Sequence, residues 1–219
     1  AMRDFNHVMR ARAAGAKLIV ISPLYDATAA KADWWIPIEP ATDGALALAM
    51  THVLIEQGLY DADYAVKHTV APFLVRADNG QFLRAKDLGE AATADAYVVW
   101  DEASGAPVPM PARTDALPGV RPALRAAVTV GGIACRTAFD LLAERAAQFT
   151  PARASEVCKL PEAAIRQLAL EYARARPSTI KIGIGATRTF HGDLNARAIL
   201  ALAALTGDVG RSGGGASGW

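Results

Sequence analysis

A chain of 219 residues, 52% of them hydrophobic, is long enough for one large domain or two small ones and too apolar to be intrinsically disordered. Its 23 basic and 22 acidic residues leave a formal net charge of +1, which favours neither a nucleic-acid partner nor an anionic membrane surface. The sequence has no run of 18 apolar residues, so we expect no transmembrane helix.

The first residues have the order of an α/β unit. Residues 2–14 predict a helix that ends at Gly15. Residues 17–21 form a nearly continuous apolar run, which is typical of a strand buried on both faces of a parallel sheet, and Ser22 and Pro23 break it. The order of helix, glycine, strand and loop is that of the second half of a doubly wound unit.

A second extended piece, around residues 35–38, precedes a helix that Thr42 is expected to cap. This helix continues to residue 57, and Gly58 is a plausible stop. Four of its apolar side chains share one helical face: Leu46, Met50, Val53 and Leu54. A short helix over residues 61–67 follows.

Residues 71–135 have a different, β-rich pattern. Asp78-Asn79-Gly80 and Gly131-Gly132 each separate two extended segments and predict hairpins, and residues 97–101 predict another strand. Five prolines between residues 107 and 122 argue against long regular elements there. We interpret this stretch as an insertion between two parts of an α/β domain, residues 1–70 and residues 136–219.

The α/β pattern then resumes with three helices, at residues 136–149, after Thr150-Pro151, and between Pro161 and Pro177. A strand is predicted over residues 179–185. We expect the fold class to be α/β, with a doubly wound and mainly parallel sheet flanked by helices and a β-hairpin-rich insertion.

The last helix is expected over residues 194–205, with Asp193 as its cap, and it enters a glycine-dense end at residues 205–215. Glycine lets the backbone approach a bulky ligand because no Cβ stands in the way. The chain stops right after these glycines, which suggests part of a larger protein.

Candidate site residues follow two predicted strands. Ligands of open α/β sheets bind outside the carboxyl ends of the strands, which here are residues 22–26 and residues 183–191. The alternative is that these loops are polar only because they lie on the surface.

The second of these loops contains the first two glycines of a dinucleotide fingerprint, Gly183 and Gly185. Arg188 stands where the third glycine should be, and no helix is predicted to begin at once, so nicotinamide-dinucleotide binding is disfavoured. Arg188 and His191 could face phosphates or a substrate, or they could be solvated loop side chains.

Asp43 has two interpretations. A carboxylate in the first turn of a helix stabilises the helix dipole by about 0.3–1 kcal/mol. It could instead accept two parallel hydrogen bonds from the ring N–H and the exocyclic amine of a guanine. Cys135 and Cys158 are interpreted as buried small hydrophobes, with a disulfide as the alternative, and no residue cluster has metal-ligand spacing.

Three blocks of the sequence resemble a known family. Residues 15–23 read GAKLIVISP, residues 28–46 read TAAKADWWIPIEPATDGAL, and residues 205–215 read LTGDVGRSGGG. Together they resemble the molybdopterin oxidoreductases of the dimethyl sulfoxide reductase type. Four positions depart from the family pattern, since Ser22, Leu24, Ala41 and Ser212 stand where Asp, Arg, Gly and Pro are usual.

The resemblance implies a molybdenum or tungsten ion held by two pyranopterin guanine dinucleotides. Asp43 would read the guanine, Ser22 and Tyr25 would contact the ribose or base, and the loop matching residues 184–188 would lie near the pterin and metal. The implied cofactor-binding residues are Ser22, Pro23, Leu24, Tyr25, Asp26, Ala41, Thr42, Asp43, Ile184 and Arg188. Arg188 and His191 are the candidates for facing substrate or pterin.

The resemblance also implies that much of the site lies elsewhere. In the family, the protein ligand of the metal and any 4Fe–4S cluster precede the Gly15 region. We therefore expect part of a catalytic subunit that is inactive alone, with a small-molecule substrate, the rest of its own subunit and an iron–sulfur electron-transfer subunit as partners. The sequence itself does not indicate a compartment, and the resemblance implies the bacterial periplasm or a membrane-associated complex, with the cytoplasm as the alternative. The alternative is a non-catalytic α/β module that binds a guanine nucleotide.

Overall fold

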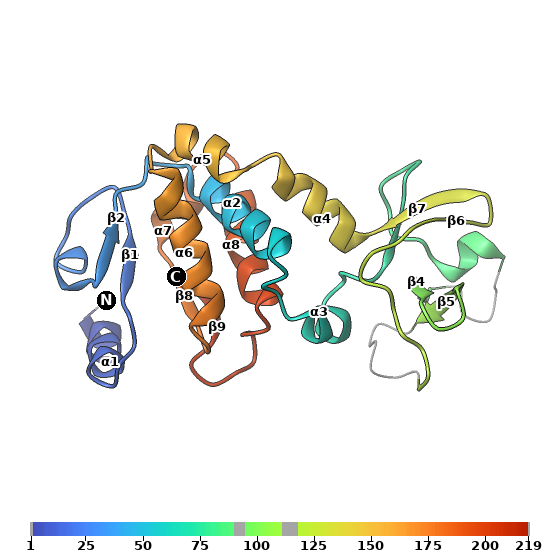
Figure 1. Cartoon of the computed structure of the whole chain (residues 1–219), viewed down its shortest axis with the longest axis horizontal. Coiled ribbons are helices and arrows are strands. Elements are labelled where there is room, and N and C mark those ends of the chain that lie inside the picture. The colour runs from blue at the N-terminus through green and yellow to red at the C-terminus, as the bar shows by residue number, and fades with distance from the viewer. Residues whose placement is uncertain (1, 90–94, 111–117, 219) are drawn as a thin grey trace.

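The computed structural model describes residues 2–89, 95–110 and 118–218. Figure 1 shows an elongated molecule with the N-terminal helix and the first two strands at one end. A group of helices occupies the centre, and a β-rich part lies at the other end. In the described residues no helix has the length and apolarity needed to cross a membrane.

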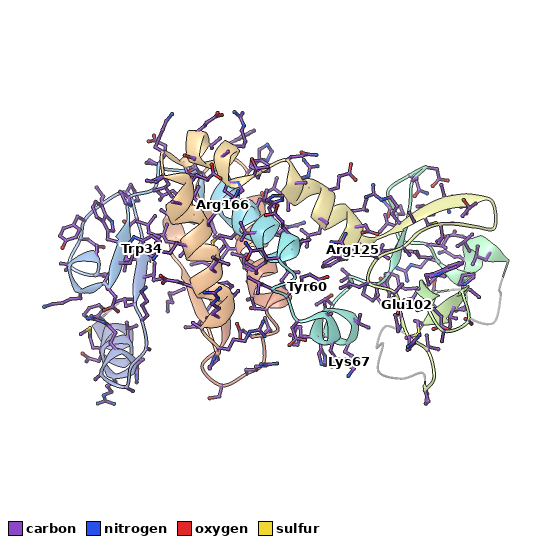
Figure 2. The ribbon with its side chains drawn as sticks, in the orientation of Figure 1. Trp34, Tyr60, Lys67, Glu102, Arg125 and Arg166 are labelled. Atoms are coloured by element: carbon purple, nitrogen blue, oxygen red, sulfur yellow. The ribbon has the colours of Figure 1, made fainter. Side chains whose placement is uncertain are left out.

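The N-terminal part has the predicted order. Helix α1 (Met2–Ala13) is followed by Gly15, and strands β1 (Ile19–Ile21) and β2 (Trp34–Ile36) pair in parallel with Val20 opposite Trp35. The prediction that the first strand is buried on both faces is wrong, because Ile21 is 41% exposed. In a sheet of only two strands, neighbouring elements do not cover both faces of each strand. Figure 2 shows Trp34 on the side of this pair that faces the central helices.

Helix α2 (Asp43–Glu56) is the centre of the main hydrophobic core. The predicted face, Leu46, Met50, Val53 and Leu54, is buried. Ala47, Ala49 and Thr51 are buried as well, because α2 packs against several other helices. These neighbours are α4 (Ala138–Ala147), α5 (Pro151–Cys158), α6 (Glu162–Arg174) and α8 (Gly192–Leu205).

The β-rich part contains both predicted hairpins and begins after the short helix α3 (Ala62–His68). Its elements are β3 (Leu74–Arg76), η2 (Ala85–Leu88), β4 (Tyr97–Asp101), β5 (Ala106–Met110), β6 (Ala127–Val130) and β7 (Ile133–Thr137). The Arg76 N–H donates to the Gln81 carbonyl over 2.8 Å across the first hairpin, and Gly131-Gly132 joins β6 to β7 in the second. Two small hydrophobic clusters fill this part.

Strand β5 is a short regular element that contains two of the prolines after residue 106. Pro107 and Pro109 lie opposite Trp100 and Val98 in the antiparallel pair with β4. The two prolines are two residues apart, so their backbone nitrogens point to the same side of the strand. In the described sheet, β5 pairs with another strand on one side only. Their missing N–H groups therefore fall on the free edge, where an edge strand tolerates proline.

The ring of Phe139 on α4 contacts both the chain after α2 and the β-rich part. Tyr60 follows α2, and its ring centroid lies 5.1 Å from that of Phe139 on α4. The guanidinium of Arg125 lies 4.9 Å from the same Phe139 ring. Tyr60 and Arg125 are seen between the two parts in Figure 2. The proposed boundaries at residues 70 and 135 stay a prediction.

The C-terminal part differs from prediction at three points. Strand β8 (Thr179–Ile182) is shorter than expected because α7 (Ile184–Thr187) begins directly after Gly183. His191, with φ of 57°, occupies the N-cap position of α8 in place of Asp193, which lies in the first turn. The glycine-dense end is not only a turn, since β9 (Gly215–Gly218) pairs in parallel with β8.

The fold class is mixed α/β. The described strands form four small sheets, and parallel pairing is confined to β1–β2 and β8–β9. One continuous, doubly wound sheet is not confirmed.

Candidate functional site

The carboxyl ends of β1 and β2 bring the first two candidate segments together. The backbone N–H of Ser22 donates to the carbonyl of Ile36 over 3.1 Å, so the chain leaves both strands at the same edge. The indole N–H of Trp35 donates to the carbonyl of Ser22 over 3.0 Å and holds the loop to β2. The loop over residues 22–26 and the segment leading to Asp43 therefore start side by side.

Within this loop, two of the predicted residues are used to shape the backbone. The hydroxyl of Ser22 accepts from the N–H of Leu24 over 3.2 Å. One carboxylate oxygen of Asp26 accepts from the N–H groups of Thr28 and Ala29, over 2.9 and 2.8 Å, at the start of the short helix η1 (Ala29–Lys31).

The side chains between them face solvent. Leu24 is 71% exposed and Tyr25 64% exposed, and Pro23 is exposed too. The ring of Tyr25 meets Trp35 edge-on at 5.0 Å between centroids, which fixes its position without covering it. Pro23, Leu24 and Tyr25 thus have side chains that are open to a ligand.

Ala41 and Thr42 form the turn that enters α2. Thr42 is at the N-cap position, but its hydroxyl donates to the Glu39 carbonyl over 2.7 Å and makes no cap hydrogen bond, contrary to prediction. Ala41 has φ of 67°, a left-handed conformation that costs an L-residue about 1–2 kcal/mol. The family pattern has glycine at this position, and the structure gives the physical reason for it.

We expect Ala41→Gly to raise the free energy of unfolding by about 0.5–1 kcal/mol, because relief of the left-handed strain exceeds the extra entropy of glycine in the unfolded chain. Chemical denaturation of the two proteins measures the difference. Ala143→Gly, in the middle of α4, is the matched control and should lower the same free energy by about 1 kcal/mol. A loss of stability on Ala41→Gly would contradict the strained turn.

Asp43 is the first residue of α2 and is half-buried. Burial raises the pKa of its carboxyl group, and the N–H of its own backbone opposes that shift. No other side chain of the described residues forms a hydrogen bond or ion pair with this carboxylate. It is therefore a desolvated acceptor that a ligand with two N–H donors would satisfy.

Asn195 connects Asp43 to the third candidate segment. A Cβ on Gly44 would collide with the Asn195 side-chain oxygen, so α2 and α8 cross closely at this point. The Asn195 amide donates to the Ala186 carbonyl over 3.2 Å and lies 3.4 Å from the hydroxyl of Thr189. The segment around residues 184–191 is thus held next to the start of α2. No pattern in the sequence singles out Asn195.

Gly44→Ala should shift the Asn195 amide and release the segment it holds. The expected change in the free energy of unfolding is below about 1 kcal/mol, because alanine's helix propensity offsets one lost hydrogen bond. Hydrogen exchange of residues 186–189 should become faster, and Asn195→Ala, which adds no atom at position 44, should have the same effect. Unchanged exchange in both variants would show that Asn195 does not hold this segment.

Helices α2 and α8 run in the same direction. Gly44 and Asn195 meet near their N-terminal ends, and beyond their C-terminal ends the N–H of Asp61 donates to the Leu205 carbonyl over 2.8 Å. The positive ends of two helix dipoles therefore lie together beside the candidate segments, an arrangement that favours anionic groups such as phosphates.

The remaining predicted residues face solvent. Ile184 is 50% exposed, and Arg188 and His191 are exposed. The His191 ring lies 4.1 Å from that of Phe190, which is 91% exposed. The structure therefore leaves Arg188 and His191 exposed to a ligand, and among the described residues no side-chain hydrogen bond or ion pair assigns either of them a role.

A depression of about 640 Å³ lies elsewhere, at the amino ends of β1 and β2. It is lined by Met9, Arg12, Ala13, Gly15, Ala16, Lys17 and Asp33, none of which is a predicted site residue. Since ligands of parallel strands bind at the opposite, carboxyl end, we do not assign the site to this depression. Over the described ranges, no group of three or more His, Cys, Asp or Glu residues is placed to hold a metal ion.

Comparison with known proteins identifies relatives along almost the whole chain. The family model described as molybdopterin oxidoreductase matches residues 3–219. The chain is 34% identical to the perchlorate reductase subunit alpha of Dechloromonas aromatica, over 97% of this chain and 26% of that protein. It is 32% identical to the dimethylsulfide dehydrogenase subunit alpha of Rhodovulum sulfidophilum, over 99% of this chain and 24% of that protein.

The fold has a solved counterpart. Acetylene hydratase from Pelobacter acetylenicus matches with a TM-score of 0.60 and 21% sequence identity, over 96% of this chain and 20% of that one. The chain thus spans about a quarter of the length of the curated relatives named above.

Proposed function

Because the chain belongs to the molybdopterin oxidoreductase family, we propose that it forms part of the cradle for molybdenum bis(molybdopterin guanine dinucleotide), or its tungsten analogue, in a larger catalytic subunit. The relatives support this proposal by their names, which describe a reductase and a dehydrogenase. They also support it by their length, because this chain covers only 26% and 24% of them. When bound, the cofactor supplies oxygen-atom or two-electron transfer.

The single observation that carries the assignment is the environment of Asp43. A half-buried carboxylate with a raised pKa and no side-chain partner in the described structure lies where two helix N-termini meet. Guanine offers two adjacent N–H donors that match the two carboxylate oxygens. The residues present therefore fit the guanine end of the dinucleotide.

Each candidate segment receives a role in this proposal. Asp43 accepts from the guanine, and Tyr25 and Ser22 contact the ribose or base from the neighbouring loop. Pro23, Leu24, Asp26, Ala41 and Thr42 shape the wall of the guanosine site. Ile184 and Arg188, on the segment that Asn195 holds, lie toward the pterin, and Arg188 and His191 face pterin or substrate.

The rest of the machinery is proposed to lie in other parts of the subunit. These parts supply the metal's protein ligand, any 4Fe–4S cluster and the strands that extend β1–β2 and β8–β9 into a doubly wound, mainly parallel sheet. An iron–sulfur subunit passes electrons, and the substrate is a small molecule. Relatives named as alpha subunits support a multisubunit complex.

The proposal is tested on the full-length subunit purified with its cofactor. Metal analysis and mass spectrometry of the released small molecules should find molybdenum or tungsten, a pterin and a guanine nucleotide. A guanine nucleotide without pterin or metal would support the non-catalytic nucleotide-binding module instead. None of the relatives named above is described as such a module.

A further inference from the structure

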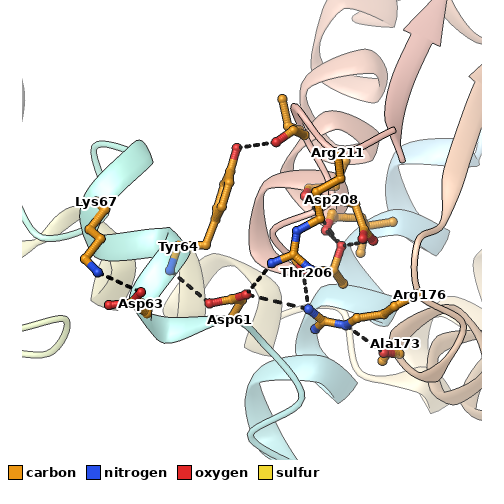
Figure 3. Close-up of polar contacts among 12 residues, drawn as sticks. Asp61, Asp63, Tyr64, Lys67, Ala173, Arg176, Thr206, Asp208 and Arg211 are labelled. Carbon is orange, nitrogen blue, oxygen red and sulfur yellow. Dashed lines mark hydrogen bonds and ion pairs between the residues drawn. The ribbon is translucent and has the colours of Figure 1, made fainter. Parts of the chain in front are cut away.

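A turn over residues 206–211 connects α8 to the glycine-rich end of the chain. The loop before α3 contacts this turn through Asp61. Figure 3 shows the residues involved, with Asp61 between two arginines. One oxygen of Asp61 lies 3.3 Å from a guanidinium nitrogen of Arg211 and 3.7 Å from one of Arg176. The other oxygen accepts from the N–H of Tyr64 over 2.9 Å and caps α3. A single carboxylate thus links three segments that are distant in sequence.

Backbone contacts strengthen the same link. The N–H of Asp61 donates to the Leu205 carbonyl over 2.8 Å, and the hydroxyl of Tyr64 donates to the Val209 carbonyl over 3.1 Å. Arg176 donates to the carbonyl of Thr206, so it reaches both Asp61 and the turn. The turn over residues 206–211 is therefore bound to α3 along its length.

The turn is also anchored from inside. Thr206 and Asp208 are fully buried, and the hydroxyl of Thr206 donates to an Asp208 carboxylate oxygen over 2.9 Å. The Asp208 carbonyl accepts from the N–H of Arg211 over 3.2 Å. This inner anchor fixes the start of the turn, whereas the side chain of Arg211 is half-exposed and has Asp61 as its ion-pair partner.

We propose that Asp61 is a positioning residue for the glycine-rich segment that follows Arg211. Without the carboxylate, two guanidinium groups would face each other across the turn and repel, and Arg211 would lose its hold on α3. With it, the backbone of residues 211–214 runs from the turn directly into β9, which pairs with β8. The inference rests on the proposed function, since β9 carries the chain from this turn to the carboxyl end of β8, the end at which the cofactor site is proposed.

Asp61→Asn isolates the charge, because asparagine still caps α3 through its side-chain oxygen. We expect hydrogen exchange of residues 207–214, measured in the cofactor-free full-length subunit, to become about tenfold faster, as expected for loss of a charge-assisted interaction. Asp63→Asn is the matched control. Asp63 lies on the same helix and pairs with Lys67 over 2.8 Å, away from the turn, so its removal should leave this exchange unchanged.

Trypsin gives a second readout, because the bond after Arg211 should be cleaved about tenfold faster in Asp61→Asn than in wild type. Cofactor content should then fall in Asp61→Asn and not in Asp63→Asn. Exchange and cleavage equal to wild type in Asp61→Asn would overturn the positioning role. Faster exchange with full cofactor content would show that Asp61 holds the turn without positioning it for the cofactor, and would equally overturn the proposal.

These outcomes are separable from failure of the proposed function. That failure would appear as a wild-type protein without pterin or metal, whatever the exchange at the turn. The exchange measurement needs no cofactor, so the structural step of the inference is judged independently.

Discussion

Asp43→Asn in the full-length subunit should weaken retention of the guanine dinucleotide by about 10- to 100-fold. Hydrogen bonds to a charged acceptor are worth about 1.5–3 kcal/mol, and the asparagine amide would also place a donor against a guanine donor. The measurement is cofactor content after dialysis, together with the dissociation rate. Asp43→Ala removes the acceptor altogether and should weaken retention of the dinucleotide at least as much.

The same substitution should barely affect the stability of the cofactor-free protein. Loss of a first-turn acid costs about 0.3–1 kcal/mol, and relief from burying a carboxylate acts in the opposite direction. Thermal unfolding of cofactor-free samples is the control. A large drop in melting temperature with normal cofactor content would make Asp43 a helix-stabilising residue and refute its role as a guanine reader.

Acidic pH should mimic this substitution. Burial raises the pKa of Asp43 in the folded protein above its ordinary value, so ionisation is disfavoured in the free site and the carboxylate protonates at a higher pH than in an unfolded chain. Only the ionised form accepts two hydrogen bonds, so the affinity for the dinucleotide should fall as the pH drops through the raised pKa of the free site. Binding should restore ionisation and release a proton. Asp43→Asn should lack this pH dependence, and an identical profile in both proteins would contradict it.

Gly207→Ala should lower the free energy of unfolding by about 2–5 kcal/mol. Gly207 has φ of 69°, and a Cβ there would lie 2.8 Å from an Asp61 carboxylate oxygen and 3.0 Å from Tyr64 side-chain carbons. Left-handed strain costs about 1–2 kcal/mol, and overpacking against the start of α3 adds about 1–3 kcal/mol. Denaturant unfolding measures the sum.

Gly210→Ala separates these two causes. Gly210 has φ of 86°, but a Cβ there would meet no atom within 4 Å. Its replacement should cost only the backbone strain, about 1–2 kcal/mol. If both substitutions lowered the free energy of unfolding equally, close contact between the turn and α3 would contribute nothing to the effect of Gly207→Ala.

Local patterns predicted the elements that local physics determines. The apolar spacing of α2 identified its buried face, and Gly131-Gly132 placed a hairpin correctly. Errors arose where tertiary structure decides. The first strand was predicted to be buried on both faces, but β1 is partly exposed because its sheet has two strands.

For the candidate site too, the sequence predicted what depends on local patterns and missed what depends on tertiary contacts. The sequence pointed to the segments around Ser22 and Asp43, and in the structure the loop at Ser22 and the segment that leads to Asp43 start from the same edge of the β1–β2 pair. Asn195 and Asp61 were missed because each acts on segments far away in the chain. Their hydrogen bonds depend on how α8 crosses α2 and on where α3 begins, which no local pattern encodes.

A crystal structure of the full-length subunit with its cofactor bound tests the central claim most directly. The account predicts both carboxylate oxygens of Asp43 within about 2.7–3.2 Å of the ring N–H nitrogen and the exocyclic amine of a guanine. The loop over residues 22–26 should flank that guanosine. A guanine bound elsewhere, with the Asp43 carboxylate beyond about 4 Å of any guanine nitrogen, would contradict the account.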